Sequence, residues 1–346
     1  MISMEGKTSK LLVSARLFWP DAMRVIATFF VIVIHAKSLP PTTDGVSYIP
    51  YTLFALSKTS VPLFFMLSGA LLLGKNGSPV SFYKKRLMRL VYPWLFWTLF
   101  FVLWSVFFRN TEITSLGELV RLFYVGLLTG LWFLPIIVGV YLLTPVYKNI
   151  IIRSSGKTIA IILVVWFVLF SYLPYFLPKI SLFESIPIQI LAYSGYYLLG
   201  YVIIKENFSS IRIGILVSLG GMLLSLLSFW LARSVQNSVS LQTFEYLFPG
   251  TVIASVGVFI VLYSFFRKQQ YNLSSKSSRL FHGLSVLSLG ILFLHQFLLE
   301  LGNRYFPLYR KEFILDGLVK GVLLFSISAG IIWSLRKVPL LRKFVT

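Results

Sequence analysis

Ten apolar runs of membrane-spanning length divide this chain of 346 residues, with short polar segments between them. A helix needs about 20 mostly apolar residues to cross the hydrocarbon core of a bilayer. Because lipid offers no hydrogen-bond partners, each segment must satisfy its own backbone groups, as a helix does. We therefore predict spanning helices at residues 20–37, 50–73, 90–108, 130–147, 158–176, 186–204, 213–232, 247–266, 281–301 and 314–335. Residues 109–129 give the weakest pattern and have room for a short amphipathic helix before the fourth span.

Lysine and arginine are unevenly divided between the segments that join these spans. With the N-terminus placed in the cytoplasm, the cytoplasmic segments hold 21 of the 32 Lys and Arg residues, the opposite side holds 8, and three lie within spans. The positive-inside rule makes this asymmetry a topology signal. We predict an all-α, polytopic transmembrane helical bundle of about ten spans, with both termini cytoplasmic and residues 1–346 forming a single membrane domain. No cleavage signal follows the polar, basic first 18 residues, so we expect the first helix to be retained.

The net charge of +21 falls almost wholly in the loops. Charge placed in this way argues against nucleic-acid binding and makes the predicted cytoplasmic face strongly electropositive. Such a face suits anionic lipid headgroups, and equally a polyanionic soluble substrate. The chain has no cysteine, which excludes disulfides, thiolate metal sites and a cysteine nucleophile. Of its three histidines, two lie far from the third in the sequence, so we expect no metal site.

Arg24 and His35 are polar side chains inside the first apolar run. Eleven residues of α-helix turn through about 1100°, so both side chains lie on one face, about 16 Å apart along the axis. Such groups are costly in lipid and are functional candidates by default. Asp21, three residues before Arg24, is spaced to pair with it and to lower the cost of its burial. The unperturbed pKa of histidine, about 6.5, suits His35 to general-base catalysis.

The pattern Arg-x10-His in the first span resembles the membrane acyltransferase-3 family, bacterial enzymes that O-acylate surface carbohydrates. Further segments resemble signatures of that family in the same order along the chain: VPLFFMLSG at 61–69, KRLMRLVYPW at 85–94, GLWFL at 130–134, YLLTP at 141–145, YLLGY at 197–201 and LGILFLH at 289–295. Each segment is weak alone, but the ordered set covers essentially the whole chain. Two positions depart from the pattern. Lys58 stands where relatives often carry arginine, and Gln296 follows His295 where they often carry proline.

The resemblance implies a fold, a reaction and a set of site residues. It implies an O-acyltransferase that takes an acetyl or other short acyl group, such as succinyl, from a cytoplasmic acyl-CoA. The residues that it favours for catalysis are His35, Arg24, Asp21 and Lys58. Those that it favours for the donor are Arg86, Arg89, Lys85, Trp132 and Tyr92. The candidates for the acceptor are His295, Tyr197, Tyr201 and Ser68, and no metal is implied.

Each of these residues also has a purely structural interpretation. Arg24 alone fits a side chain that snorkels to the membrane surface, and the basic run around Arg86 fits a topology signal. Trp132 and the tyrosines fit packing and the aromatic belts at the membrane surfaces. His295 fits a hydrogen-bonded interior histidine, and His282 lies beside a cytoplasmic loop, where we expect it at the surface.

Three classes of function remain open on the sequence. The first is a membrane O-acyltransferase of the bacterial cytoplasmic membrane, whose partners are lipid, acyl-CoA and a glycan or lipid-linked sugar, with homo-oligomers possible. The second is a transporter or flippase for a glycan or lipid-linked sugar, although we find no repeated halves. The third is a membrane module that binds a ligand without chemistry. The identity of the acceptor glycan and of the acyl group stays open.

Overall fold

The structure is a computed structural model that describes residues 17–36, 48–75, 77–108, 115–118, 120–121, 132–175, 185–236, 245–269, 275–306 and 316–345. Within these ranges the chain forms helices and no strand, which confirms the predicted all-α bundle. Nine helices in the described part are long and apolar enough to cross a membrane, or ten if one bent pair counts as a single span. The chain is therefore a multi-pass membrane protein.

The helices follow the predicted spans closely, and several extend beyond them. In chain order they are α2 (Phe18–Ala36), α3 (Tyr48–Lys58), α4 (Ser60–Leu72), α5 (Pro79–Phe108), α7 (Phe133–Leu142), α8 (Thr144–Arg153), α9 (Gly156–Phe167), α10 (Ile186–Lys205), α11 (Ile211–Gln236), α12 (Pro249–Gln269), α13 (Ser275–Tyr305), α14 (Asp316–Arg336) and α15 (Arg342–Val345). A π-helical turn, Val168–Tyr172, and a 3₁₀ turn, Leu173–Tyr175, continue α9. The amphipathic helix expected at 109–129 lies largely outside the described residues.

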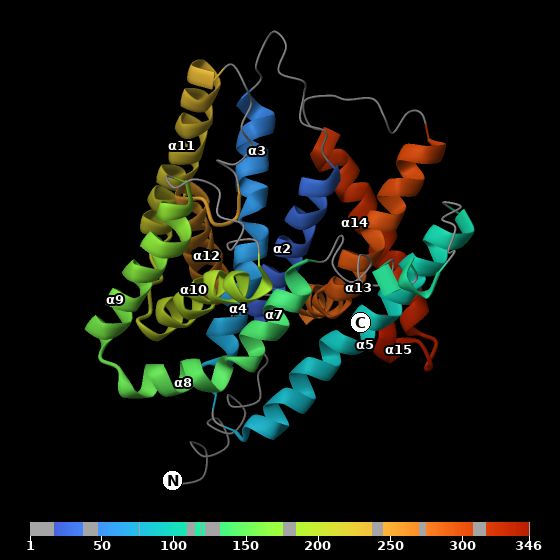
Figure 1. The fold of residues 1–346 in the computed structure, drawn as a ribbon, viewed down its shortest axis with the longest axis horizontal. Helices are drawn as coiled ribbons and strands as arrows, with labels where there is room; N and C mark the ends of the chain where they lie inside the picture. Colours follow the sequence, from blue (N-terminus) through green and yellow to red (C-terminus); the bar gives the residue numbers. More distant parts are fainter. Residues whose placement is uncertain are drawn as a thin grey trace.

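The helix is interrupted in two of the predicted spans, which apolar length alone did not predict. The second span divides into α3 and α4 at Thr59, and the fourth divides into α7 and α8, which bend by 50°. Pro62 and Pro145 follow the two breaks. Proline has no N–H for the residue four positions earlier and its ring clashes with that carbonyl, so a helix kinks or breaks just before it. Figure 1 shows α8 running across the lower end of the bundle.

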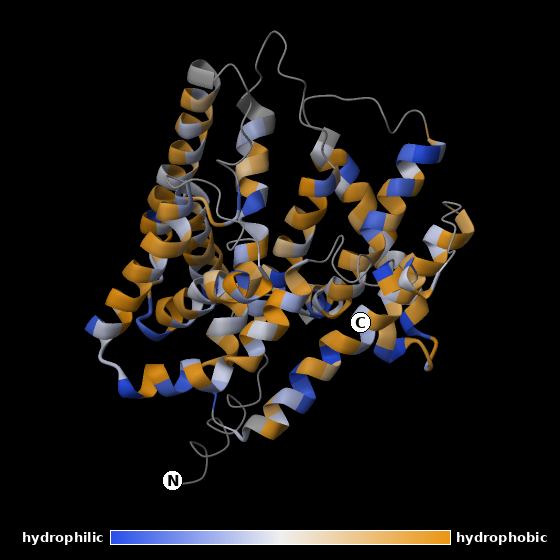
Figure 2. Cartoon of the chain, viewed as in Figure 1, coloured by the Kyte–Doolittle hydropathy of each residue, from blue (hydrophilic) through white to orange (hydrophobic). Residues whose placement is uncertain are grey.

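The first helix, α2, lies at the centre of the bundle (Figure 1). It packs against α13, α14 and α4, and less extensively against α12 and α3. By contrast, α9 and α11 lie at one side, and their outward residues are apolar and exposed, as expected for lipid-facing helices (Figure 2). Asp21 and Thr28, two of the polar side chains of α2, are therefore buried among other helices.

Glycines let α4 and α10 touch backbone to backbone. A Cβ added to Gly69 would lie 1.7 Å from the carbonyl oxygen of Tyr197, and one added to Gly200 would lie 1.8 Å from that of Met66. Small residues allow this close approach in membrane helices, where packing rather than the hydrophobic effect drives association. The contact fixes the wall that α4 and α10 form behind the candidate site.

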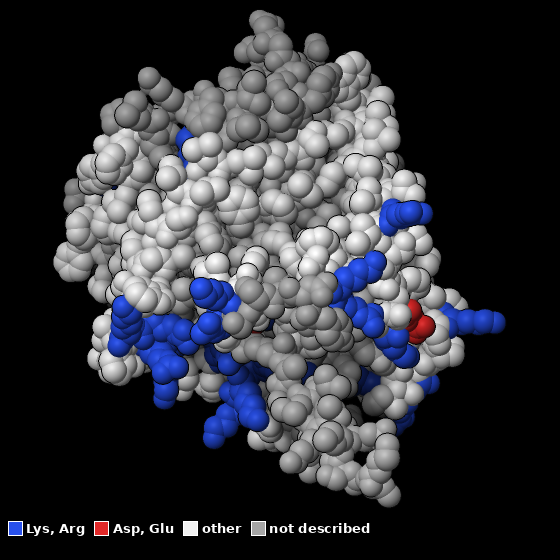
Figure 3. Space-filling view, turned by 180° about the vertical axis from the view of Figure 1, so that it is seen from behind, with Lys and Arg blue, Asp and Glu red and all other residues white. Residues whose placement is uncertain are grey.

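Basic side chains gather toward one end of the molecule. On the face shown in Figure 3, most of the blue side chains lie in the lower half, and the upper half is largely uncharged in its described part. This distribution agrees with the one-sided loop charge found in the sequence. The cytoplasmic assignment of that end stays a prediction.

We predict that Gly69→Leu destabilises the protein and that Gly220→Leu does not. A Cβ at Gly220 meets no heavy atom within 4 Å, whereas Gly69 has no room for one. Overpacking typically costs about 1–3 kcal/mol. Thermal unfolding of the two detergent-purified variants measures the difference, and equal melting temperatures would contradict the described α4–α10 contact.

Candidate functional site

The site is built on two helices, α2 and α13, that run side by side in the same direction. Arg24, in the second turn of α2, donates a hydrogen bond of 2.6 Å to the hydroxyl of Ser285, which lies about three turns into α13. About three turns further along, the rings of His35 and His295 lie 5.3 Å apart between centroids. Arg24 and His35 therefore both face α13, as their eleven-residue spacing predicts. The two contacts define a lower and an upper polar layer.

The lower layer contains one carboxylate with three polar side chains around it, those of Arg24, Ser285 and His282. Asp21 is buried, with 6% of its side chain exposed, and its Oδ1 lies 3.4 Å from Nη1 of Arg24. Ser285 donates a hydrogen bond of 2.8 Å to the same oxygen. Nδ1 of His282 lies 3.3 Å from Oδ2 of Asp21. The carboxylate thus holds Arg24 in place, which confirms the predicted Asp21–Arg24 pair.

A cavity of about 670 Å³ opens beside the lower layer. Its walls come from α2, α4, α5, α7, α13, α14 and α15. Six lysine and arginine residues line it, and no acidic residue is among its described lining. These six are Arg24, Arg86, Arg89, Arg336, Arg342 and Lys343. The cavity is therefore a strongly electropositive pocket suited to a polyanion.

The remaining walls of the cavity are mainly apolar. They include Phe64, Leu67, Phe133, Leu134 and Ile137. A ligand that fits this cavity must combine a highly anionic part with a longer, less polar part.

One polar pair stands among the apolar walls of the cavity. The hydroxyl groups of Ser68 and Tyr141 lie 3.0 Å apart, and both residues line the cavity. Tyr197, expected at the acceptor, is buried behind them, and its hydroxyl lies 3.0 Å from Oγ1 of Thr144. Tyr201 lies further along α10 beside Lys205, toward the end of that helix that we predict to be cytoplasmic. Neither of these two tyrosines is among the lining residues.

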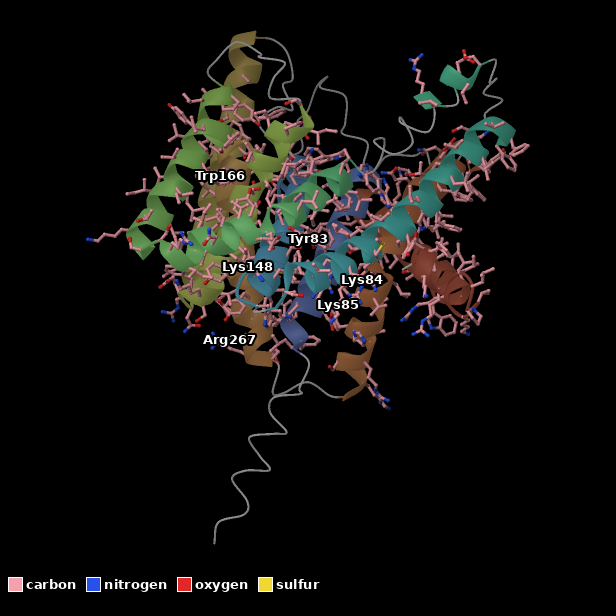
Figure 4. All side chains as sticks on the ribbon, turned by 60° about the horizontal axis from the view of Figure 1, so that its bottom comes forward. Tyr83, Lys84, Lys85, Lys148, Trp166 and Arg267 are labelled. Atoms are coloured by element: carbon pink, nitrogen blue, oxygen red, sulfur yellow. The ribbon has the colours of Figure 1, made fainter. Side chains whose placement is uncertain are left out.

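The residues expected to bind the donor divide into two groups. Arg86 and Arg89 line the cavity. Lys85 is exposed at the lower end of α5, beside Lys84 (Figure 4). Tyr92 packs its ring against Phe344, with centroids 6.0 Å apart. Lys85 and Tyr92 are thus not among the residues that line the cavity.

Trp132, also expected at the donor, belongs to a different group near the end of α3. Its ring lies 5.3 Å from that of Tyr246, and the Lys58 ammonium lies 4.5 Å from the centroid of the same tyrosine ring. Phe54 adds a second ring, 5.2 Å from the ammonium. Burial and the carboxylate of Glu245 raise the pKa of Tyr246, so its phenol keeps its proton. Lys58 therefore has aromatic partners, as a cation at membrane depth requires.

The upper layer consists of the two histidines. His295 is fully buried, and its Nδ1 lies 3.3 Å from the carbonyl oxygen of Ile291 one turn earlier. Its Nε2 is buried and has no hydrogen-bond partner among the described residues. His35, unlike His295, is exposed, and it is not among the residues lining the basic cavity. The cavity reaches Leu292, one helical turn before His295.

Several residues of the site escaped sequence reasoning. Ser285 is 261 positions from Arg24, and nothing in the local pattern of α13 marks it. His282, expected at the surface, has 39% of its side chain exposed, contacts Asp21 and lines the cavity. Three basic residues near the C-terminus, Arg336, Arg342 and Lys343, carried only a topology signal in the sequence. The sequence shows that these three residues are basic, but only the fold shows that they line the cavity.

The comparisons with known proteins give one match. The model of the acyltransferase-3 family, described as "Acyltransferase domain", matches residues 17–337. No curated protein and no solved structure matches the chain. The matched range contains both polar layers and all of the cavity lining except Arg342 and Lys343.

We predict that Asp21 and Ser285 act together to hold Arg24. Asp21→Asn removes the negative charge from this network and Ser285→Ala removes both hydrogen bonds of its hydroxyl, so their effects on the free energy of unfolding are expected to be non-additive. Residues in one network typically couple by about 0.5–3 kcal/mol. A double-mutant cycle, followed by denaturation in detergent, measures the coupling. Additive effects of the two substitutions would show that the network does not act as a unit.

Proposed function

The chain belongs to the acyltransferase-3 family, and from this premise we propose that it is an integral-membrane O-acyltransferase using acyl-CoA. The donor carries an acetyl or another short acyl group, and the acceptor is a hydroxyl of a cell-surface or lipid-linked glycan. The membrane is the bacterial cytoplasmic membrane. The observation that carries the proposal is the cavity in which six basic side chains adjoin an apolar interior, beside Arg24 of α2.

The donor fits this cavity through its two chemically distinct parts. The nucleotide end of acyl-CoA carries several phosphate groups, and arginine binds phosphate by charge-assisted, often bidentate hydrogen bonds. Arg86 and Arg89 of α5 and Arg24 of α2 supply such groups. The pantetheine arm is less polar and enters between α4, α7 and α13, where Ser68 and Tyr141 offer hydroxyl groups. The end of the bundle that holds these arginines is the one whose loops carry most of the basic charge.

Catalysis is assigned to His35. The oxygen of the acceptor hydroxyl attacks the thioester carbonyl carbon, and His35 takes the hydroxyl proton as a general base. The C–S bond then breaks, and the thiolate of CoA leaves and takes up a proton. His295 lies against the His35 ring and is positioned to orient it. An acyl-enzyme on His35 or on a tyrosine is the alternative route to the same products.

The oxyanion that forms at the carbonyl requires a cation near His35. Lys58 is the last residue of α3, and α3 packs against α2, the helix that carries His35. Arg24 lies about 16 Å lower along α2 and is held by Asp21 and Ser285. We therefore assign the oxyanion to Lys58 and a donor phosphate to Arg24. The sequence alone does not decide whether Lys58 or Arg24 stabilises the oxyanion, and this assignment gives that role to Lys58.

The acceptor approaches His35 from the end of α2 opposite the basic cavity. The ring of Trp132 lies 5.5 Å from that of Tyr193 and 5.3 Å from that of Tyr246, the ring that Lys58 also contacts. Aromatic rings with polar edges suit a sugar, which has both apolar faces and hydroxyl groups. We place the acceptor against this aromatic group and His295. We do not assign Tyr197 and Tyr201 to the acceptor, because Tyr197 is buried behind Ser68 and Tyr141 and Tyr201 lies beside Lys205.

We predict that His35→Ala abolishes acyl transfer while donor binding persists. Loss of a general base costs typically 10²–10⁴-fold in rate, and His35 is not among the residues lining the donor cavity. Transfer of radiolabelled acetyl from acetyl-CoA into glycan and lipid-linked sugar fractions measures the rate. Titration of the purified variant with CoA checks the donor site. Full activity in a folded His35→Ala variant would refute the catalytic assignment.

We predict the opposite pattern for Arg89→Ala. Because Arg89 is exposed, its pairing with a phosphate contributes about 1 kcal/mol, so the KM for acyl-CoA is expected to rise about fivefold, with kcat nearly unchanged. Lys84→Ala is the matched control, because Lys84 lies on the same helix but is exposed and outside the cavity lining (Figure 4). Equal KM values for the two variants would show that the donor does not bind in this cavity.

A further inference from the structure

The last residues described in the chain fold back onto the basic cavity. After α14 ends at Arg336, a turn leads to the short helix α15, which packs against α5 and also contacts α13 and α14. Val345 is completely buried, and the ring of Phe344 lies 6.0 Å from the rings of both Tyr92 and Phe96 of α5. The segment is therefore docked on the bundle by apolar contacts, and its position is defined.

A glycine on α13 makes this docking possible. A Cβ added to Gly290 would lie 2.2 Å from the carbonyl oxygen of Val345, so no larger residue fits there while α15 keeps its place. Gly283, two turns earlier on the same helix, faces open space instead. The backbone of α15 thus rests directly on α13, the helix that also carries Ser285 and His295.

Docking brings three basic side chains to the cavity. Arg342 and Lys343 are exposed on the solvent side of α15 and line the cavity mouth, and Arg336 lines it from the end of α14. Nε of Arg336 is buried and has no hydrogen-bond partner among the described residues. Lys337, the next residue, instead places its ammonium 3.4 Å from the ring centroid of Trp333 and is not among the lining residues. Within this segment, Arg336, Arg342 and Lys343 line the cavity, whereas Lys337 does not.

We propose that Arg336, Arg342 and Lys343 form a phosphate-binding wall for the nucleotide end of the donor, opposite Arg86 and Arg89. The inference rests on the proposed function, since it takes acyl-CoA as the donor, and it adds a role for the C-terminal segment. Arg86 and Arg89 on α5 and the three cations from α14 and α15 line one cavity with no acidic residue among its described lining. Like charges brought together in this way repel one another, and a bound polyanion relieves the repulsion.

The first test compares CoA affinity between the wild type and three variants of the whole chain in detergent. The double variant Arg342→Ala/Lys343→Ala is expected to bind CoA about five- to tenfold more weakly than the wild type, because both lost groups are exposed. Lys337→Ala is expected to match the wild type. Arg342→Lys, which keeps the charge, is expected to retain most of the affinity. Higher salt is expected to narrow the difference between the double variant and the wild type.

The second test displaces α15 from its position but leaves all of its charged residues unchanged. Gly290→Ala is expected to displace α15 and weaken CoA binding although Arg342 and Lys343 are still present, whereas Gly283→Ala is expected to bind as the wild type does. The melting temperature of each ligand-free variant shows whether the bundle is intact. Wild-type affinity in Gly290→Ala, with the fold retained, would overturn the proposed wall.

The outcomes separate this proposal from the proposed function. Wild-type protein that binds no CoA would overturn both. Wild-type protein that binds CoA and transfers acyl groups, with an affinity unchanged in Arg342→Ala/Lys343→Ala, would overturn only the phosphate-binding wall. Weaker binding in the double variant, with kcat at saturating acyl-CoA unchanged, supports the wall, because a general loss of structure would lower kcat as well.

Discussion

The parallel contact between α2 and α13 is the interaction on which the site depends. Each helix carries polar groups that are costly in a membrane, and each supplies partners for those of the other. Arg24 finds Ser285 near the beginning of the pair, and His35 finds His295 three turns later. The two contacts lie at nearly equal spacings on the two helices, so they fix the axial register of α2 against α13. A slip of one turn along either helix would leave a buried charge or ring without its partner.

The cavity exists because the helices around this pair are packed unevenly. Behind the site, Gly69 and Gly200 bring α4 and α10 into backbone contact and leave no space. In front of it, α5 and α7 carry large side chains and stand off from α2, and α15 closes the opening between α5 and α13. The bend of 50° between α7 and α8 lets the chain change direction after Leu142. Close contact on one side and wider spacing on the other thus produce one electropositive pocket.

The sequence predicted what local patterns encode. Apolar length located the spans, and helical periodicity placed Arg24 and His35 on one face of α2. It did not predict contacts between distant segments, because Ser285 is an ordinary small residue and Gly290 matters only through the docked α15. Counting lysine and arginine identified the basic end of the bundle, but the count does not distinguish a topology signal from a ligand-binding group. Lys85 and Arg89 look alike in sequence, and only the helical turn between them decides which lines the cavity. The helix breaks had a signal in Pro62 and Pro145, which the apolar pattern obscured.

The separation of the two polar layers bears on how a thioester is protected from water. Between the basic layer at Arg24 and the histidine layer, the facing sides of α2 and α13 are mainly apolar, with Ala27 and Val31 on one helix and Leu292 on the other, all buried. Thr28, the one hydroxyl residue of α2 in this stretch, directs its hydroxyl at the Arg24 carbonyl oxygen, 2.8 Å away. Under the proposed function, the phosphates stay with the arginines near the aqueous phase while the acyl group passes into this drier stretch toward His35. A layer that excludes water at that point suppresses hydrolysis of the donor. It also strengthens the interaction of Lys58 with the developing oxyanion, because electrostatic interactions gain energy where the dielectric constant is low. The apolar layer is thus as much a part of the proposed chemistry as the charges on either side of it.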